Sequence, residues 1–131
     1  MEIAVSHEQA RVPVTVFHIK GNITGNTYQQ FEDTVRDAIK GGAHYVLLDL
    51  TDVGYISSAG LRSLNYFYSL LSKGPAPGEQ AQEDTAKSGI HKSPYLKLHN
   101  PSTRALQAIQ LVGFDKFFEV YYDYAEALAS F

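Results

Sequence analysis

The stretch Tyr45–Leu71, YVLLDLTDVGYISSAGLRSLNYFYSLL, changes its hydrophobic period near its middle. Residues 45–50 form an apolar run of strand length, which predicts a strand that is buried on both faces. From Leu61 onward apolar residues recur at helical spacing, which predicts a helix with one buried stripe. The small residues Ser57–Gly60 lie between the two patterns. The stretch therefore predicts a buried strand, a turn and a helix that begins at two serines.

The serines at the start of this helix admit two interpretations. Ser57 or Ser58 can serve as the N-cap, accepting a hydrogen bond from a backbone N–H that has no partner within the helix. Alternatively, the serines mark a phosphate site, because a helix N-terminus carries about half a positive charge. Gly60 would let an anion approach the backbone closely. The residue chemistry alone leaves both interpretations open.

The segment DLTDVGYISSAGLRSL, residues 49–64, resembles the signature of the STAS domain, in the form carried by bacterial anti-sigma-factor antagonists. The matching positions are Asp49-Leu50-Thr51, Tyr55-Ile56 and Ser57-Ser58-Ala59-Gly60-Leu61. This resemblance implies that Ser58 is the phosphoacceptor, while Ser57 stands where members of the family often carry Asp. It also implies a phosphosite neighbourhood or partner-binding surface, made of Ser57, Ala59, Gly60, Leu61, Asp49, Asn22 and Thr24.

The resemblance implies a function in a partner-switching pathway. The unphosphorylated form would bind a GHKL-type anti-sigma serine kinase and so release a sigma factor. Phosphorylation of Ser58 by that kinase would switch binding off, and a PP2C-type phosphatase would reverse the step. Two alternatives remain open. One is a STAS module that is not phosphorylated and acts as a scaffold or a transporter-associated subunit, and the other is a small-ligand or nucleotide-binding domain.

The remaining hydrophobic patterns predict an α/β fold. Strands are expected at residues 2–7, 12–20, 45–50, 95–99 and 119–121. Besides the serine-capped helix, helices are expected from Thr27 to the glycines 41–42, from 103 to 112 and from 123 to 131, with Thr27 and Gln30 as a capping box. Together with the resemblance, this order predicts a single STAS-like domain over residues 1–131. Its mixed sheet should have four to five strands, with about four helices mainly on one face.

Residues 72–94 interrupt these patterns. The segment SKGPAPGEQAQEDTAKSGIHKSP is rich in Gly, Pro, Gln and charged residues and has no sustained apolar period. Such a composition is typical of a flexible loop. Loop-closure entropy grows only logarithmically with length, so the segment is expected to be a flexible insertion that the fold tolerates.

Composition excludes several classes of protein. The chain has 131 residues, of which 44% are hydrophobic and 19% are charged, as expected for one soluble globular domain. Its net charge of −3 and the lack of a basic block argue against nucleic acid as a partner. With no cysteine, disulfides and thiolate metal sites are excluded. No secretory signal or run of 18 apolar residues is found, so we expect a cytoplasmic protein without membrane insertion.

No catalytic motif stands out in the sequence. The nucleophile elbow Gly-x-Ser-x-Gly, the P-loop and the dinucleotide-binding Gly-x-Gly-x-x-Gly are all missing. The histidines show no metal-binding spacing, so neither a metal nor a cofactor is expected. They are His7, His18, His44, His91 and His99. Because no partner can be assigned to a nucleophile, the sequence predicts that the protein is not an enzyme.

Overall fold

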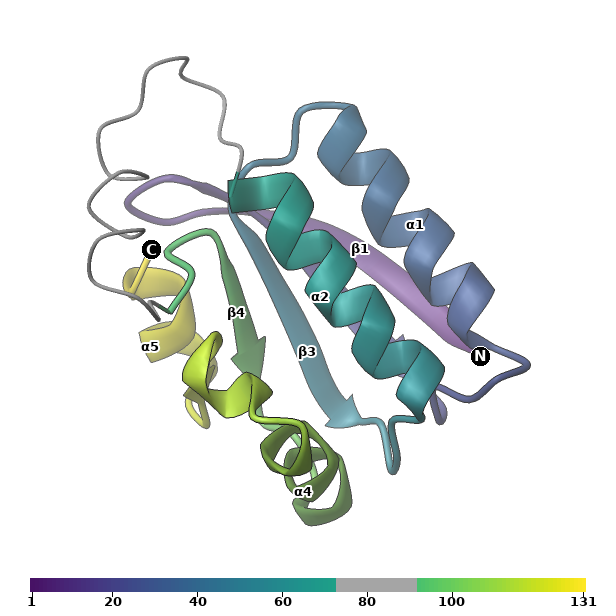
Figure 1. Cartoon of the computed structure of the whole chain (residues 1–131). Coiled ribbons are helices and arrows are strands. Elements are labelled where there is room, and N and C mark those ends of the chain that lie inside the picture. Colours follow the sequence, from purple (N-terminus) through teal and green to yellow (C-terminus); the bar gives the residue numbers. More distant parts are fainter. Residues whose placement is uncertain (73–91) are drawn as a thin grey trace.

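A single mixed sheet organises the computed structural model, which describes residues 1–72 and 92–131 (Figure 1). Its strands are β1 (Glu2–Gln9), β2 (Pro13–Lys20), β3 (Val46–Asp52), β4 (Leu96–His99) and β5 (Glu119–Tyr121). They lie in chain order, with β1 antiparallel to β2 and every later pair parallel. The predicted mixed α/β sheet is confirmed, with five strands in the described residues.

The order of the strands decides where the helices lie. The helices are α1 (Tyr28–Lys40), α2 (Ser58–Ser72), α4 (Thr103–Leu111), α5 (Tyr124–Ala129) and the short 3-10 helix η1 (Phe114–Lys116). From β2 to β5 each new strand is added on the same side, and parallel crossovers are right-handed, so α1, α2 and α4 fall on one face. Figure 1 shows α1 and α2 side by side over the sheet. Among the helices of the described residues, only α5 packs on the opposite face, which confirms helices mainly on one side.

β3 is buried on both faces, as its continuous apolar run predicts. Leu48 and Leu50 belong to the larger core, together with Phe31 of α1 and Phe67 of α2. These two aromatic rings meet edge to face with their centroids 5.3 Å apart, a preferred geometry for aromatic pairs. Leu47 points the other way, into the smaller core beneath α5.

The start of α1 differs from the prediction. Thr27 makes no side-chain cap for α1. Its hydroxyl instead donates to the carbonyl oxygen of Asn22 and accepts from the N–H of Thr24, each at 2.8 Å. The amide of Gln30 donates to the carbonyl of Met1. The predicted capping box is therefore wrong, because the loop before α1 uses the threonine hydroxyl for its own turn.

The other helix ends follow their sequence signals. Gly42, just after α1, has a φ of 120°, which suits the glycine that ends a helix. Ser102 caps α4 by accepting from the N–H of Ala105, and Asp123 caps α5 by accepting from the N–H of Glu126. α5 stops at Ala129, two residues short of the predicted end.

Most of the predicted insertion, residues 73–91, lies outside the described residues. The borders of the prediction were too wide, because Ser72 is the last residue of α2. At the other end Ser93 is buried, and its N–H donates to the carbonyl of Phe117. The Ser93 hydroxyl also accepts from the N–H groups of Tyr95 and Leu96, so this serine is part of the start of β4.

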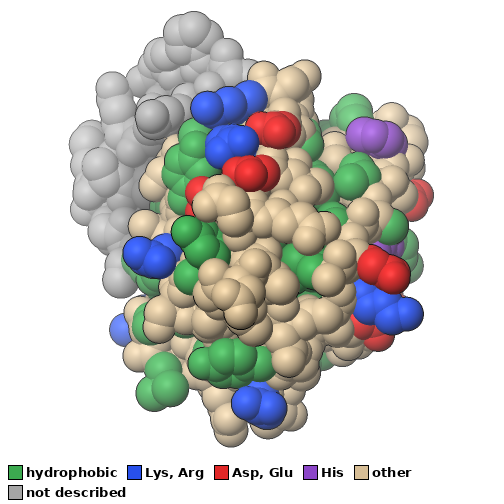
Figure 2. Space-filling model, turned by 90° about the vertical axis from the view of Figure 1, so that its right-hand side faces the viewer, with side chains coloured by type: hydrophobic (Ala, Val, Ile, Leu, Met, Phe, Trp, Pro, Cys, Tyr) green, Lys and Arg blue, Asp and Glu red, His purple; other side chains and the backbone are tan. Residues whose placement is uncertain are grey.

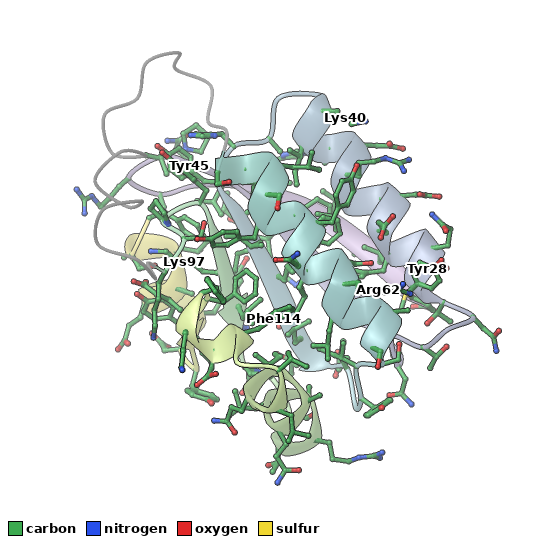
Figure 3. All side chains as sticks on the ribbon, in the orientation of Figure 1. Tyr28, Lys40, Tyr45, Arg62, Lys97 and Phe114 are labelled. Carbon is green, nitrogen blue, oxygen red and sulfur yellow. The ribbon has the colours of Figure 1, made fainter. Side chains whose placement is uncertain are left out.

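A buried lysine of β4 contacts the C-terminal end of the chain that follows α5 and holds this helix against the sheet (Figure 3). Lys97 is only 4% exposed. Its ammonium group donates to the carbonyl oxygen of Ser130 at 2.8 Å and lies 3.2 Å from the carboxylate of Glu119. The same group stands 4.7 Å from the ring centroid of Phe131. A helix as short as α5 has little stability of its own, so these contacts hold the end of the chain in place.

Asp49 links three strands on the same face as α5. Its two oxygens lie 2.8 Å from Nδ1 of His18 on β2 and 2.9 Å from Nδ1 of His99 on β4. Thr51 donates to it from its hydroxyl at 2.6 Å and from its N–H at 3.2 Å. Burial opposes ionisation, but the hydrogen bonds from Thr51, His99 and His18 outweigh it and lower the pKa of Asp49 to about 2. Two of the scattered histidines, His18 and His99, thus meet at one carboxylate.

Charges of both signs are mixed on the surface. Figure 2 shows acidic and basic side chains interspersed on the side of the molecule that carries α1. On that helix Arg36 pairs with Asp33 and Asp37, each at 3.0 Å. Within residues 1–72 and 92–131 no group of three or more His, Cys, Asp or Glu side chains could hold a metal ion. No helix of this part is long and apolar enough to cross a bilayer.

Two loops join at the end of the sheet toward which β3 and β4 point. Ile23 and Ile56 form an isolated parallel bridge, and both are buried. The N–H of Ile23 donates to the carbonyl of Tyr55 at 2.9 Å, and the N–H of Ser57 donates to the carbonyl of Ile23 at 2.7 Å. Gly60 packs directly against this bridge. A Cβ at residue 60 would lie 2.6 and 2.8 Å from the Cγ2 atoms of Ile23 and Ile56.

We therefore expect Gly60→Ala to lower the free energy of unfolding by about 1–3 kcal/mol, the usual cost of overpacking a core. This loss should appear although alanine is the better helix former. Urea denaturation measures it. The matched control is Gly25→Ala in the neighbouring loop, where a Cβ would meet nothing within 4 Å. A Gly60→Ala variant as stable as Gly25→Ala would contradict the close contact.

We also expect Asp49 to make the stability of the domain sensitive to acid. Its folded-state pKa of about 2 is below the ordinary value of 3.8, so its contribution is complete above pH 4 and is lost as the pH falls toward 2. The shift corresponds to about 2 kcal/mol. Urea denaturation at a series of pH values should show this loss in the parent and not in Asp49→Asn. Asp52→Asn removes an exposed carboxylate of the same strand and should keep the parent's profile.

Candidate functional site

Ser57 is the residue that caps α2. Its hydroxyl accepts from the N–H of Gly60 at 3.3 Å, and its carbonyl accepts from the N–H of Leu61 at 2.9 Å. The side chain is half-buried. Ser57 thus satisfies backbone groups at the start of the helix, as an N-cap serine should.

Ser58 is the first residue of α2 and presents its hydroxyl to solvent. It is exposed, and this hydroxyl makes no hydrogen bond to any other residue that the structure describes. The next three residues, Ala59, Gly60 and Leu61, are buried and face the core. Of the five small or apolar residues at the start of this helix, Ser58 is therefore the one that an external enzyme can reach.

The loop before α1 lies beside the serines, as the resemblance implies. The bridge between Ile23 and Ile56 joins the two loops. Asn22 is exposed and lies against the serine loop, since a Cβ at Gly54 would be 2.8 Å from the amide oxygen of Asn22. Thr24 is half-buried, and its hydroxyl accepts from the N–H of Asn26 at 3.1 Å.

Asp49 does not join this neighbourhood. Its partners His18 and His99 lie against the ring of Tyr124 in α5, with centroid distances of 6.1 and 5.5 Å. The carboxylate therefore points to the face covered by α5, whereas α2 packs on the opposite face. Successive side chains of a strand alternate between faces, and the position of Asp49 in β3 puts it on the side away from Ser58.

The structure adds residues that the sequence motifs did not indicate. The hydroxyl of Ser102, at the start of α4, donates to the carbonyl of Gly54 at 3.2 Å. The guanidinium of Arg104 lies 5.1 Å from the ring centroid of Tyr55, which is 37% exposed. These contacts bring α4 to the edge of the serine loop. Their partners are far apart in the sequence, so no local pattern could have revealed them.

The electrostatic setting of Ser58 suits a negatively charged group. The N-terminal end of α2 carries about half a positive charge. Arg62, labelled in Figure 3, lies on α2. It follows Ser58 by four residues, about one helical turn, so the two residues share one side of the helix. It is exposed, and no ion pair joins it to another described residue. No carboxylate or imidazole hydrogen-bonds Ser58 within the described part of the chain. Ser58 therefore has the setting of an acceptor for a phosphoryl group, with no base of its own.

Solved structures share this fold. An anti-sigma factor antagonist from Mycobacterium paratuberculosis superposes with a TM-score of 0.69 at 20% identity, over 98% of this chain and 93% of the other. The anti-sigma factor antagonist SpoIIAA in its unphosphorylated form gives a TM-score of 0.64 at 16% identity, over 95% and 92%. A sulfate transporter family protein from Wolinella succinogenes gives 0.58 at 23% identity, over 88% and 82%. At such identities the likeness shows the fold alone.

The family of this chain is identified from its sequence, because the structural likeness shows only the fold. No curated protein matches the chain. Residues 5–74, which include β2, β3, the loop contact at Ile23 and the serine-capped helix, match the STAS domain. This match covers more than half of the chain, and the chain belongs to the STAS domain family.

Proposed function

We propose that this STAS domain is an anti-sigma factor antagonist of a partner-switching pathway, with Ser58 as its phosphoacceptor. The observation that carries the proposal is the difference between the two serines: the Ser57 hydroxyl caps α2, whereas the Ser58 hydroxyl is exposed and has no described partner. The structural neighbours that are themselves anti-sigma factor antagonists support the same function.

In this proposal the unphosphorylated domain binds a GHKL-type anti-sigma serine kinase in the cytoplasm and releases a sigma factor. The kinase transfers a phosphoryl group from its own ATP to the Ser58 oxygen, and a PP2C-type phosphatase later removes it. The domain is the substrate of both enzymes, so this role requires no catalytic residue or cofactor from the chain. The exposed surface around Ser58, with Asn22, Tyr55 and Arg62, is the proposed contact with the kinase.

Phosphorylation would act on this surface rather than on the fold. A phosphoserine carries about −1.5 to −2 charges at neutral pH. At the start of a helix such a charge is favoured by the helix dipole, so it should not unfold α2. The added charge and bulk would instead oppose the approach of the kinase, because a strongly hydrated dianion is costly to bury in an interface.

A transporter-associated role is the second candidate. The structural likeness to a sulfate transporter family protein favours it, because the fold occurs in both settings. In that role the domain would bind its partner without phosphorylation of Ser58. Phosphorylation by a kinase therefore separates the two proposals.

We expect a GHKL-type anti-sigma kinase from the same organism to label Ser58 when it is supplied with ATP. Ser58→Ala should abolish labelling and leave the free energy of unfolding nearly unchanged, because this hydroxyl holds nothing in the fold. Ser57→Ala should keep labelling and lose about 0.5–2 kcal/mol of stability, the cost of a helix cap. Intact-mass spectrometry with peptide mapping and urea denaturation measure the two effects. Labelling of Ser57, with Ser58 unmodified, would overturn the assignment.

We further expect Ser58→Asp to weaken the complex with this kinase by at least about tenfold, equivalent to about 1.4 kcal/mol. The carboxylate reproduces part of the phosphate charge at the contact surface. Isothermal titration calorimetry measures the affinity, with Ser58→Ala as the binding-competent reference. Ser69→Asp places the same charge at an exposed position of α2 about three turns away and should bind like the parent. Equal affinities for the two aspartate variants would show that Ser58 lies outside the contact.

A further inference from the structure

The face of the sheet opposite Ser58 carries a chain of hydrogen bonds that begins at another serine. The hydroxyl of Ser6 on β1 lies 3.1 Å from Nε2 of His18 on β2. Nδ1 of the same imidazole lies 2.8 Å from Oδ2 of Asp49 on β3. A hydroxyl, an imidazole and a carboxylate linked in this order are the arrangement that activates a serine for attack on acyl groups. The sequence patterns did not indicate this arrangement, because its three residues come from three different strands.

The carboxylate decides which nitrogen of His18 is free to accept a proton. Because the pKa of Asp49 is lowered to about 2, its carboxylate is ionised at neutral pH and can only accept hydrogen bonds. Nδ1 of the neutral His18 must therefore carry the imidazole proton and donate it to Asp49. Nε2 then presents its lone pair to Ser6, whose hydroxyl donates to it. This is the tautomer that a general base for Ser6 requires.

Tyr124 of α5 lies next to this hydrogen-bond chain. Its ring lies against His18, and its hydroxyl donates to Oε2 of Glu8 at 3.3 Å. Burial and the charge of Glu8 raise the pKa of Tyr124, so the phenol keeps its proton at neutral pH. Because Glu8 accepts this single proton, Tyr124 serves to pack against the imidazole of His18.

Ser6 lies at the border of the core and is partly accessible to solvent. Ser6 is half-buried, and the side chain of His18 is 37% exposed. β1 is the edge strand of the sheet and pairs only with β2 among the described strands. A reagent can therefore reach the serine without any movement of the core.

We propose that Ser6 is a nucleophilic serine that accepts acyl groups from activated esters, with His18 as its general base. Asp49 is a positioning residue for His18. This site is separate from the Ser58 switch and does not depend on it, since the two serines lie on opposite faces of the sheet.

The proposed step conserves atoms and electrons. The Ser6 oxygen forms a bond to the carbonyl carbon of the ester while its proton passes to Nε2 of His18. The C–O bond to the alkoxide or phenoxide breaks, and the leaving group departs with the bonding electron pair. A poorer leaving group takes the proton from His18, whereas an activated one departs as the anion and His18 then releases its proton to the solvent. Water then attacks the acyl-serine, with His18 again as base, and restores Ser6 with release of the carboxylic acid.

The test is acetylation of the whole chain by 4-nitrophenyl acetate, followed by peptide mapping. We expect acetyl-Ser6 to form at least about 100-fold faster than acetyl-Ser58, the lower range of general-base catalysis. Ser58 is the internal comparison, because it is exposed and has no imidazole partner. Acetylation of Ser6 no faster than that of Ser58 would overturn the proposal, and this result requires no variant.

Matched variants distinguish a loss of Ser6 reactivity from a loss of the fold. His18→Gln should lose the labelling of Ser6, whereas His99→Gln should label at a rate close to that of the parent. Both histidines hydrogen-bond Asp49, at 2.8 and 2.9 Å, but only His18 contacts Ser6. Circular dichroism checks each fold. Equal rates for His18→Gln and His99→Gln, with both folded, would overturn the role of His18.

The positioning role of Asp49 has a spectroscopic signature. In Asp49→Asn the side-chain amide can donate to Nδ1 of His18, which moves the imidazole proton to Nε2 and removes the acceptor for Ser6. Nitrogen-15 NMR of the histidine ring should therefore report Nδ1–H in the parent and Nε2–H in this variant, together with the loss of labelling. An unchanged tautomer with unchanged labelling would show that Asp49 does not position His18.

Discussion

The burial of β3 on both of its faces is the constraint on which the rest of the structure depends. Leu48 and Leu50 anchor the core beneath α1 and α2, while Leu47 anchors the smaller core beneath α5. A strand with apolar neighbours on both sides must lie inside the sheet, with β2 and β4 on its flanks. The right-handed connection that follows it then sends α2 to the larger core, and the serines go with it.

The same strand separates the two polar regions of the molecule. Ser58 stands at the start of α2, on the face with the larger core, where the loop contact between Ile23 and Ile56 fixes the entry into the helix. Asp49 points to the other face, where α5 and the histidines surround it. A chemical change at Ser58 therefore adds charge to one surface without disturbing the hydrogen bonds of the other. The proposed phosphorylation site and the proposed reactive serine would therefore be independent of each other.

Ser57 and Ser58 are adjacent in the sequence, but Ser57 caps the helix whereas Ser58 is exposed to solvent. Ser57 lies just before the first turn, so its oxygen reaches the N–H of Gly60 and is occupied. Ser58 lies within the turn, and its side chain is directed outward. Gly60 makes this arrangement possible, because the helix approaches Ile23 and Ile56 too closely for a Cβ. The small residues of the motif thus have different functions: a cap, an exposed hydroxyl and a close packing contact.

The sequence by itself determined the class of fold, the buried strand and the serine-capped helix, because each rests on a local period or motif. The proposal that Ser58 is the phosphoacceptor likewise came from a local motif, through its resemblance to the family. Only the tertiary structure decided the face on which Asp49 lies, since a strand that is apolar on both sides has no alternation to reveal it. It also decided that Thr27 serves its loop rather than α1, because two local hydrogen bonds compete for one hydroxyl. The contacts of His18 with Ser6 and Asp49 depend on the register of three strands, which the pairing of distant segments sets and no local pattern records.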